Sequence, residues 1–132
     1  MPPPLNEAIG LTKHYRDFTV VAGISFRVEQ NECFGLLGPN GAGKSTTIKM
    51  LSAVTPPTSG SLTVFGFDAW KDARAVKARI GVVPQEDNFD PDLPVRQNLE
   101  VYARYYGLSK REAGPRIDEA LALALMRRRL IE

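Results

Sequence analysis

The chain has 132 residues, the size of one ordinary domain, and its 43% hydrophobic and 24% charged residues are typical of soluble globular proteins. The formal net charge of +2 is too small to indicate a nucleic-acid partner. No apolar run approaches the roughly 20 residues that cross a bilayer, and the Pro-rich start does not resemble a signal peptide. Cys33 is the single cysteine, which excludes an internal disulfide and favours a reducing cytosol.

Three strands are expected ahead of a glycine-rich segment. The residues from Ala8 to Tyr15 predict the first strand. Those from Phe18 to Val28 predict the second, because apolar side chains recur there at even spacing. A short apolar run at 33–37 then predicts a buried strand, in which Cys33 is a small packed side chain.

The segment 38–46 reads GPNGAGKST and fits the pattern G-x-x-x-x-G-K-[ST]. Its glycines let the backbone turn tightly and approach a phosphate group without a Cβ in the way. Successive N–H groups of such a loop form an anion-binding concavity, and the following helix adds the positive end of its dipole. Lys44 can reach the β- and γ-phosphates, and Ser45 can offer its hydroxyl to Mg²⁺.

A helix, an edge strand and another buried strand are expected after this motif. The helix runs from Ser45 to Val54, with an apolar face formed by Ile48, Leu51 and Val54. The loop TPPTSG at 55–60 ends it. An exposed-edge strand is expected at 61–67, a short helix at 72–79 and a buried strand at 80–83.

The C-terminal part of the chain is expected to be helical. Leu93-Pro94 starts one helix that stops near Gly107, and Ser109 can cap the next helix. Gly114-Pro115 breaks that second helix or starts it afresh before it runs to the end of the chain. The three arginines at 127–129 favour a solvated helix end.

Four segments stand in a fixed order and spacing: LTKHY at 11–15, LLGPNGAGKSTTIKML at 36–51, PPTSG at 56–60 and IGVVPQ at 80–85. In this order they resemble the nucleotide-binding domain of ABC transporters. The resemblance runs from Leu11 to Tyr106. Within it, the stretch from Val82 onward is similar to the branch of the family that energises drug and lipo-oligosaccharide exporters.

The resemblance implies a set of contacts with ATP and Mg²⁺. Tyr15 matches the aromatic residue that stacks on adenine, although its position alone indicates a half-buried strand tyrosine. Gln85 matches the glutamine that touches Mg²⁺ and the attacking water, although its position alone indicates a surface loop residue. Ser45 would be the other Mg²⁺ contact. The phosphate loop that would hold ATP consists of Gly38, Pro39, Asn40, Gly41, Ala42, Gly43, Lys44, Ser45 and Thr46.

The resemblance also implies an organisation and partners. Residues 1–132 would form part of one nucleotide-binding domain, with its phosphate loop at 38–46. The glutamine region at 85–94 would lie where the family contacts its permease, and a helical subdomain would begin at 94–132. The expected partners are a membrane permease subunit and a second nucleotide-binding subunit in a dimer. The expected place is cytoplasmic, at the inner face of the cell membrane.

Other features of the family are missing from this sequence. It has no LSGGQ-type segment, no switch histidine, and no apolar strand after Gln85 that ends in Asp and a catalytic Glu. Asp68 ends the apolar stretch LTVFGFD but comes too early, so we expect a surface residue. The sequence therefore predicts the N-terminal part of a domain, truncated before the signature and Walker B motifs, with no complete catalytic set.

The predicted fold class is α/β, a P-loop NTPase of ABC type. An antiparallel N-terminal β subdomain would accompany an incomplete parallel sheet with flanking helices. The predicted function is ATP binding, as part of a transport ATPase that energises export through a permease. Two alternatives stay open: an ATP-binding fragment or remnant that cannot hydrolyse ATP, and a non-transport ATPase of the same family. Whether this chain is itself an enzyme stays open with them.

Overall fold

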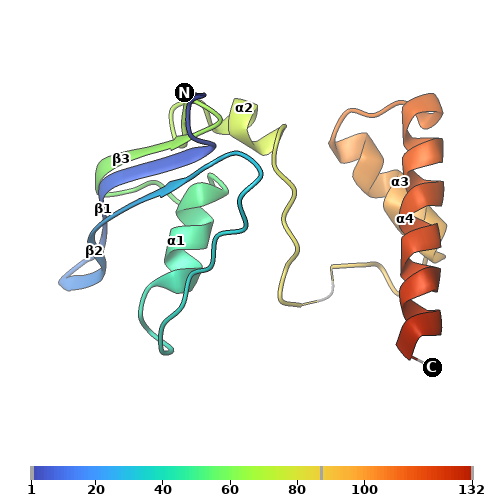
Figure 1. Cartoon of the computed structure of the whole chain (residues 1–132), viewed down its shortest axis with the longest axis horizontal. Coiled ribbons are helices and arrows are strands. Elements are labelled where there is room, and N and C mark those ends of the chain that lie inside the picture. Colours follow the sequence, from blue (N-terminus) through green and yellow to red (C-terminus); the bar gives the residue numbers. More distant parts are fainter. Residues whose placement is uncertain (1, 87, 132) are drawn as a thin grey trace. The chain divides into compact units, whose positions relative to one another are not determined.

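The computed structural model describes the backbone of residues 2–86 and 88–131 and the side chains up to residue 125, apart from residues 1 and 87. The side chains of the three arginines at 127–129 therefore lie outside the described residues. The chain divides into two compact units, Met1–Val82 and Val83–Glu132, and each is described by itself (Figure 1).

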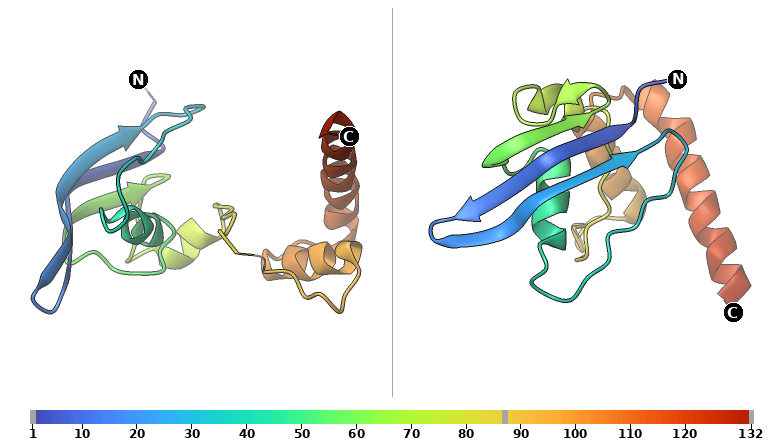
Figure 2. Two further views of the ribbon diagram at one scale, coloured as in Figure 1. Left: turned by 90° about the horizontal axis from the view of Figure 1, so that it is seen from below. Right: turned by 60° about the vertical axis from the view of Figure 1, so that its left-hand side comes forward.

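The first unit is built on an antiparallel sheet in the order β2-β1-β3-β4 (Figure 2). Its strands are β1 (Asn6–Tyr15), β2 (Phe18–Val28), β3 (Ser59–Val64) and β4 (Phe67–Asp68). β1 forms a hairpin with β2 and pairs along its other edge with β3. The strands predicted from Ala8 and from Phe18 are thus confirmed, the second with both of its bounds.

The strand expected at 61–67 is divided in two. Phe65 and Gly66 have φ angles of 52° and 80°, so the chain turns back between β3 and β4. β3 consequently lies inside the sheet rather than at its edge, and Leu62 and Val64 are buried. The prediction of a single exposed-edge strand was wrong because the edge position belongs to β4.

Two helices, α1 (Lys44–Leu51) and α2 (Ala73–Lys77), cover one face of this sheet (Figure 2). The face predicted for α1 was right for Leu51, which packs against the core, and wrong for Ile48 and Val54, which are 46% and 59% exposed. Thr47 and Met50 point into the core instead, because the sheet lies against that side of the helix. The core cluster contains Ala8, Leu11, Val21, Met50, Ala53, Leu62, Val64, Ala69 and Val76.

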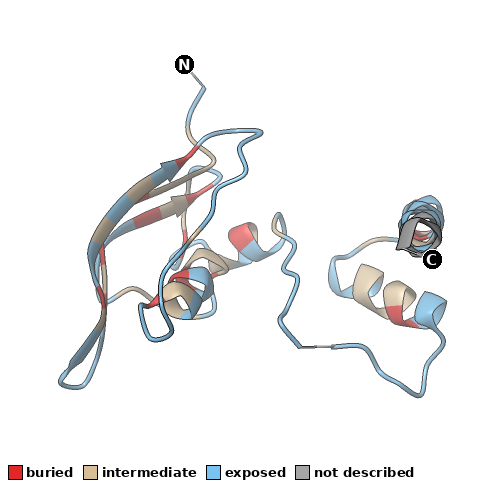
Figure 3. Cartoon of the chain, turned by 60° about the horizontal axis from the view of Figure 1, so that its bottom comes forward, coloured by how far each residue is buried: buried red, intermediate tan, exposed pale blue. Residues whose placement is uncertain are grey.

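The two segments expected as buried strands, 33–37 and 80–83, pair with no strand among the described residues. Cys33 is exposed, and Leu37 and Val83 are 97% and 96% exposed. The segment between β2 and α1 is drawn almost throughout in the colour of exposed residues in Figure 3. A strand that is buried on both faces needs hydrogen-bonded neighbours on each side and helices above and below it. The predictions failed because these segments find no such neighbours here, so the parallel part of the expected sheet is not formed.

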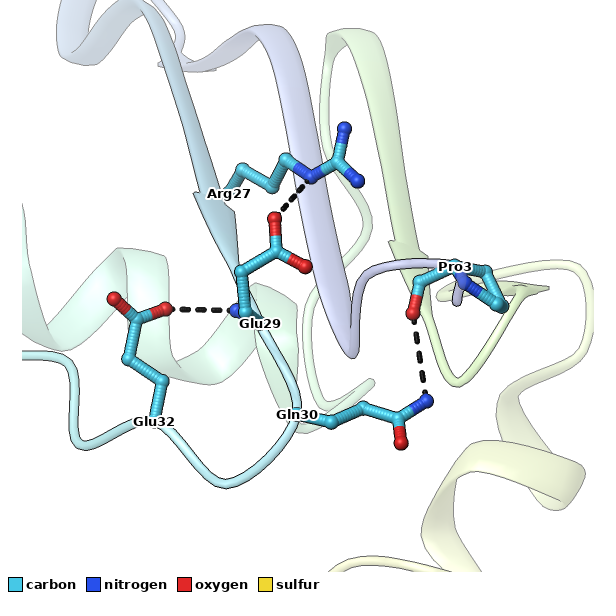
Figure 4. Close-up of polar contacts among 5 residues, drawn as sticks. All are labelled: Pro3, Arg27, Glu29, Gln30 and Glu32. Carbon is cyan, nitrogen blue, oxygen red and sulfur yellow. Dashed lines mark hydrogen bonds and ion pairs between the residues drawn. The ribbon is translucent and has the colours of Figure 1, made fainter. Parts of the chain in front are cut away.

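A small polar cluster lies at the C-terminal end of β2 (Figure 4). Arg27 Nε lies 2.5 Å from Glu29 Oε1, and the backbone N–H of Glu29 donates to Glu32 Oε2 at 2.7 Å. Gln30 Nε2 donates to the carbonyl oxygen of Pro3 at 3.5 Å. These exposed contacts link the end of β2 to the proline-rich start of the chain.

The second unit contains helices α3 (Val95–Tyr105) and α4 (Lys110–Ile131), which pack against each other. The predicted cap is confirmed: Ser109 N donates to Glu112 Oε2 at 2.9 Å, and Glu112 N donates to Ser109 Oγ at 3.3 Å. The predicted break at Gly114-Pro115 was wrong, since α4 continues through Pro115. Pro115 lies in the second turn of α4, where its missing N–H leaves the carbonyl four residues earlier without its helical donor.

None of the helices in the part of the chain that the structure describes is long and apolar enough to cross a membrane.

Candidate nucleotide-binding site

Gly43, within the segment 38–46, packs directly on β2. Gly43 precedes α1 and has a φ angle of 91°, which side-chain-bearing residues rarely adopt. A Cβ at Gly43 would lie 2.6 Å from the carbonyl oxygen of Val20 and 3.1 Å from Val21 Cγ2. Only glycine therefore allows this approach, and the contact fixes the start of α1 against the sheet.

The N-terminal end of α1 is open to an anion. The first N–H groups of a helix have no acceptor within the helix, and at this end no side chain caps them. The first turn carries no acidic residue. Thr47 Oγ1 donates to the carbonyl oxygen of Gly43 at 2.8 Å, and this buried hydrogen bond stabilises the first turn of the helix. Backbone donors and the positive helix end thus remain available for phosphate oxygens.

Lys44 and Ser45 follow directly on this turn. The Lys44 ammonium folds back over the loop and donates to the carbonyl oxygen of Gly38. Within the loop, Ala42 N donates to the carbonyl oxygen of Pro39 at 3.2 Å. Ser45 is exposed. The loop thus presents a cation and a hydroxyl beside the open helix end, the combination that a triphosphate with its metal requires.

Tyr15 lies at the same end of the sheet as Gly43. It is the last residue of β1 and pairs with Phe18 of β2, two residues before the Val20 that Gly43 contacts. Tyr15 is 47% exposed, and the Lys13 ammonium lies 5.1 Å from the centroid of its ring. An exposed aromatic ring near the phosphate loop can accept a purine by stacking. The role of Tyr15 stays a prediction.

Sequence reasoning did not identify the contacts that hold β1 beside the loop after α1. The backbone N–H of His14 donates to Thr58 Oγ1 at 2.9 Å, and Lys13 Nζ donates to the carbonyl oxygen of Pro56 at 2.6 Å. The PPTSG segment therefore braces the strand end that carries Tyr15. The sequence indicates only that Lys13 shares a face of the strand with Leu11, two residues earlier, and it gives no sign of the partner Pro56.

Gln85 belongs to the second unit, whereas Tyr15 and the phosphate loop belong to the first. Gln85 is exposed. The loop that follows it is held by Asn98, which is only 5% exposed. Asn98 Nδ2 donates to the carbonyl oxygens of Asp90 at 3.0 Å and Leu93 at 3.1 Å, and Asn98 Oδ1 accepts from Asp90 N at 2.8 Å. Asn98 is a second residue that sequence reasoning missed.

Asp68 closes a turn after β4. Its Oδ1 accepts hydrogen bonds from Trp70 N at 3.0 Å and Lys71 N at 2.8 Å. These two backbone donors, that of Lys71 first, hold the pKa of the Asp68 carboxyl below its ordinary value of 3.8. The expectation of a surface residue is met in part, since Asp68 is half-buried. In the described part of the chain, no group of three or more His, Cys, Asp or Glu could hold a metal ion.

Comparison with known proteins settles the family. The family model described as "ABC transporter" matches residues 21–131. The chain belongs to the ABC transporter family. A solved structure titled "Structure of ATP binding subunit of ABC transporter" matches with a TM-score of 0.72 and 29% identity, over 80% of this chain and 44% of that one. The predicted fold class, a P-loop domain of ABC type, is thereby confirmed.

Several similar proteins carry the name "Nod factor export ATP-binding protein I". The one from Burkholderia thailandensis is 52% identical over 112 residues, covering 85% of this chain and 37% of that protein. The one from Paraburkholderia xenovorans is 46% identical over 124 residues, covering 94% of this chain and 41% of the relative. A Rhizobium etli relative is 47% identical over 114 residues, covering 86% and 36%. This ABC chain thus spans about two fifths of the length of these relatives.

Proposed function

We propose that the chain binds Mg²⁺-ATP at residues 38–46 and Tyr15, as the ATP-binding part of an ABC subunit that energises export. The observation that carries this proposal is the start of α1. A glycine at positive φ packs against β2, an uncapped helix end follows it, and a lysine ammonium lies across the loop. These groups supply backbone donors, dipole and positive charge for one polyanion.

Each part of the nucleotide has a partner in this arrangement. The N–H groups at the start of α1 would hold the phosphates, and Lys44 would leave the carbonyl oxygen of Gly38 to contact their outer oxygens. Tyr15 would stack on the base. Such stacking contacts the face of the base and not its hydrogen-bonding edge, so it adds affinity without reading the edge. Base and phosphate contacts would then both come from the first unit.

Mg²⁺ fits this site through Ser45. Mg²⁺ prefers oxygen ligands and is commonly held by few protein groups together with substrate phosphates and water. The Ser45 hydroxyl, exposed on the first turn of α1, is such a ligand. We propose Gln85 as the other contact of the ion, on the ground of the family resemblance alone. The bound ion would neutralise phosphate charge, while Lys44 and the helix end orient the triphosphate.

The proposed partners follow from the family. The relatives' names describe ATP-binding proteins of export systems, so we propose a membrane permease as the partner of this chain and a second nucleotide-binding subunit beside it. The proposed location is the cytoplasmic face of the membrane. The loop at 88–94, held in shape by Asn98, is the segment we propose to face the permease.

Replacement of Lys44 tests the proposal. A charge-assisted hydrogen bond contributes on the order of 1.5–3 kcal/mol, so Lys44→Ala should weaken ATP roughly 10- to 150-fold in a titration with a fluorescent ATP analogue. Lys49→Ala is the matched control, because Lys49 is exposed in the last turn of the same helix. Equal affinity of Lys44→Ala and the parent chain, with both folded by thermal melt, would refute the assignment.

A further inference from the structure

Lys13 is the one lysine in the described residues with a buried side chain, and its surroundings are unusual. It is 8% exposed and lies on β1 two residues before Tyr15. Its ammonium donates one hydrogen bond, to the carbonyl oxygen of Pro56 at 2.6 Å, and lies 5.1 Å from the Tyr15 ring centroid. Its surroundings thus combine a loop carbonyl with an aromatic face.

A buried ammonium is unfavourable unless something compensates for its lost hydration. Most lysines avoid this by extending to solvent, which an exposed strand end would permit. Among the described side chains, the ion pairs are Arg27–Glu29 and Arg96–Asp118, so no carboxylate neutralises Lys13. The carbonyl of Pro56 and the ring of Tyr15 are therefore what hold this charge in place.

We propose that Lys13 is a positioning residue for the base, holding the Tyr15 ring in the orientation that stacks on a purine. This inference rests on the proposed function, because it assumes that Tyr15 stacks on the base. The ammonium covers one face of the ring and leaves the other face to a planar ligand. The bond to Pro56 ties this pair to the segment that follows α1, the helix whose other end holds the phosphates.

The argument for positioning is geometric. Tyr15 is half-exposed at the end of a strand, and a ring in that place has few neighbours to fix its rotamer. A cation on one face restricts the ring through attraction to its quadrupole. The Lys13 stem is itself fixed by burial. The ammonium at its end therefore has a fixed position, and the attraction between this ammonium and the ring restricts the orientation of the ring. A ring that is already oriented loses less conformational freedom when the base binds.

The test compares ATP with inorganic tripolyphosphate, which has no base. Lys13→Met removes the charge and the bond to Pro56 but keeps an apolar stem of similar length. A cation–π contact of ordinary strength corresponds to a roughly two- to fivefold effect, so Lys13→Met should weaken ATP by that factor and leave tripolyphosphate unchanged. Lys13→Arg should retain the affinity for ATP, since it keeps a cation over the ring. Lys77→Met, at an exposed position in α2, is the matched control.

A double-mutant cycle separates positioning from general stability. In the background of Tyr15→Ala, Lys13→Met should have no further effect on ATP, because the ring that it orients is gone. A loss that persists in this background would overturn the inference, as would equal weakening of ATP and tripolyphosphate. In the parent chain, the NMR signals of the Lys13 side chain should shift on addition of ATP but not of tripolyphosphate. This measurement tests the inference even if Lys13→Met does not fold, and an absent shift would overturn it.

The results that would refute the proposed function differ from those that would refute the inference about Lys13. If Tyr15→Ala weakens ATP and tripolyphosphate alike, Tyr15 does not stack on the base, and the inference about Lys13 falls with that part of the proposal. If Tyr15→Ala weakens ATP alone while Lys13→Met binds ATP like the parent, the stacking role stands and only the inference about Lys13 is overturned.

Discussion

The contact of Gly43 with β2 makes a sharp prediction about stability. In Gly43→Ala the new Cβ would meet the carbonyl oxygen of Val20 at 2.6 Å, a backbone atom that moves only if α1 shifts away from the sheet. The φ angle of 91° adds the strain of a left-handed conformation. The strain costs about 1–2 kcal/mol and the overpacking typically about 1–3 kcal/mol, so we expect a loss of roughly 2–5 kcal/mol.

Gly41→Ala is the matched control, because Gly41 also has a positive φ, of 84°, but no atom within 4 Å of its added Cβ. It should lose only the strain, about 1–2 kcal/mol. Gly38→Ala has no positive φ, and its Cβ would lie 3.1 Å from Ala42 Cβ, so it should lose least. The three substitutions thus separate backbone strain from the contact with β2.

Thermal unfolding followed by Trp70 fluorescence measures this series, since Trp70 is the single tryptophan and lies in the same unit. At about 4–8 °C per kcal/mol for a domain of this size, Gly43→Ala should lower Tm by at least about 8 °C and melt well below Gly41→Ala. The affinity for inorganic tripolyphosphate, measured by titration, should fall in the same order across the series. Equal melting of Gly43→Ala and Gly41→Ala would refute the claim that the loop is fixed by packing on β2.

Three further predictions concern the second unit, acid stability and turnover. Asn98→Ala should speed limited proteolysis at residues 88–94 several-fold, because each lost hydrogen bond contributes about 1 kcal/mol, whereas the exposed control Gln97→Ala should match the parent. The folded state lowers the pKa of Asp68, so its contribution to stability is present above pH 3.8 and is lost as the pH falls below that value; Asp68→Asn should flatten this part of a melt series between pH 6 and pH 3. Phosphate-release assays should show no turnover even where the titration shows that ATP binds, because no Asp-Glu pair follows an apolar strand after Gln85; turnover that Lys44→Ala abolishes would contradict this.

The parts of the fold that could be predicted are those whose patterns are local. Even spacing of apolar residues defined β2, and the loop 38–46 was recognisable from glycines whose backbone role does not depend on distant residues. The cap at Ser109 needed only a glutamate three residues later. In each case the physical cause lies within one turn or one strand of the residues that reveal it.

The errors arose where distant partners decide the outcome. The buried side of α1 depends on where the sheet lies, so Thr47 and Met50 are buried and Ile48 is not. The contact between Lys13 and Pro56 joins residues 43 positions apart, and no local pattern encodes it. The segments 33–37 and 80–83 have the composition of buried strands. Composition alone does not show whether neighbouring strands are present to pair with them.

The phosphate loop keeps its shape although the segment before it forms no strand. Its geometry comes from Gly43 on β2, from Thr47 bonded to Gly43, and from Met50 in the core beneath α1. The position of Tyr15 comes from the β1–β2 hairpin and from the PPTSG segment that braces it. Both sets of contacts lie in the antiparallel half of the fold. The exposed segments 33–37 and 80–83 contribute to neither, so the groups that we propose to bind ATP can be in place without the parallel sheet. Binding the triphosphate and completing a hydrolytic site would therefore be separable, because the contacts that we propose for the first all lie in this half of the fold.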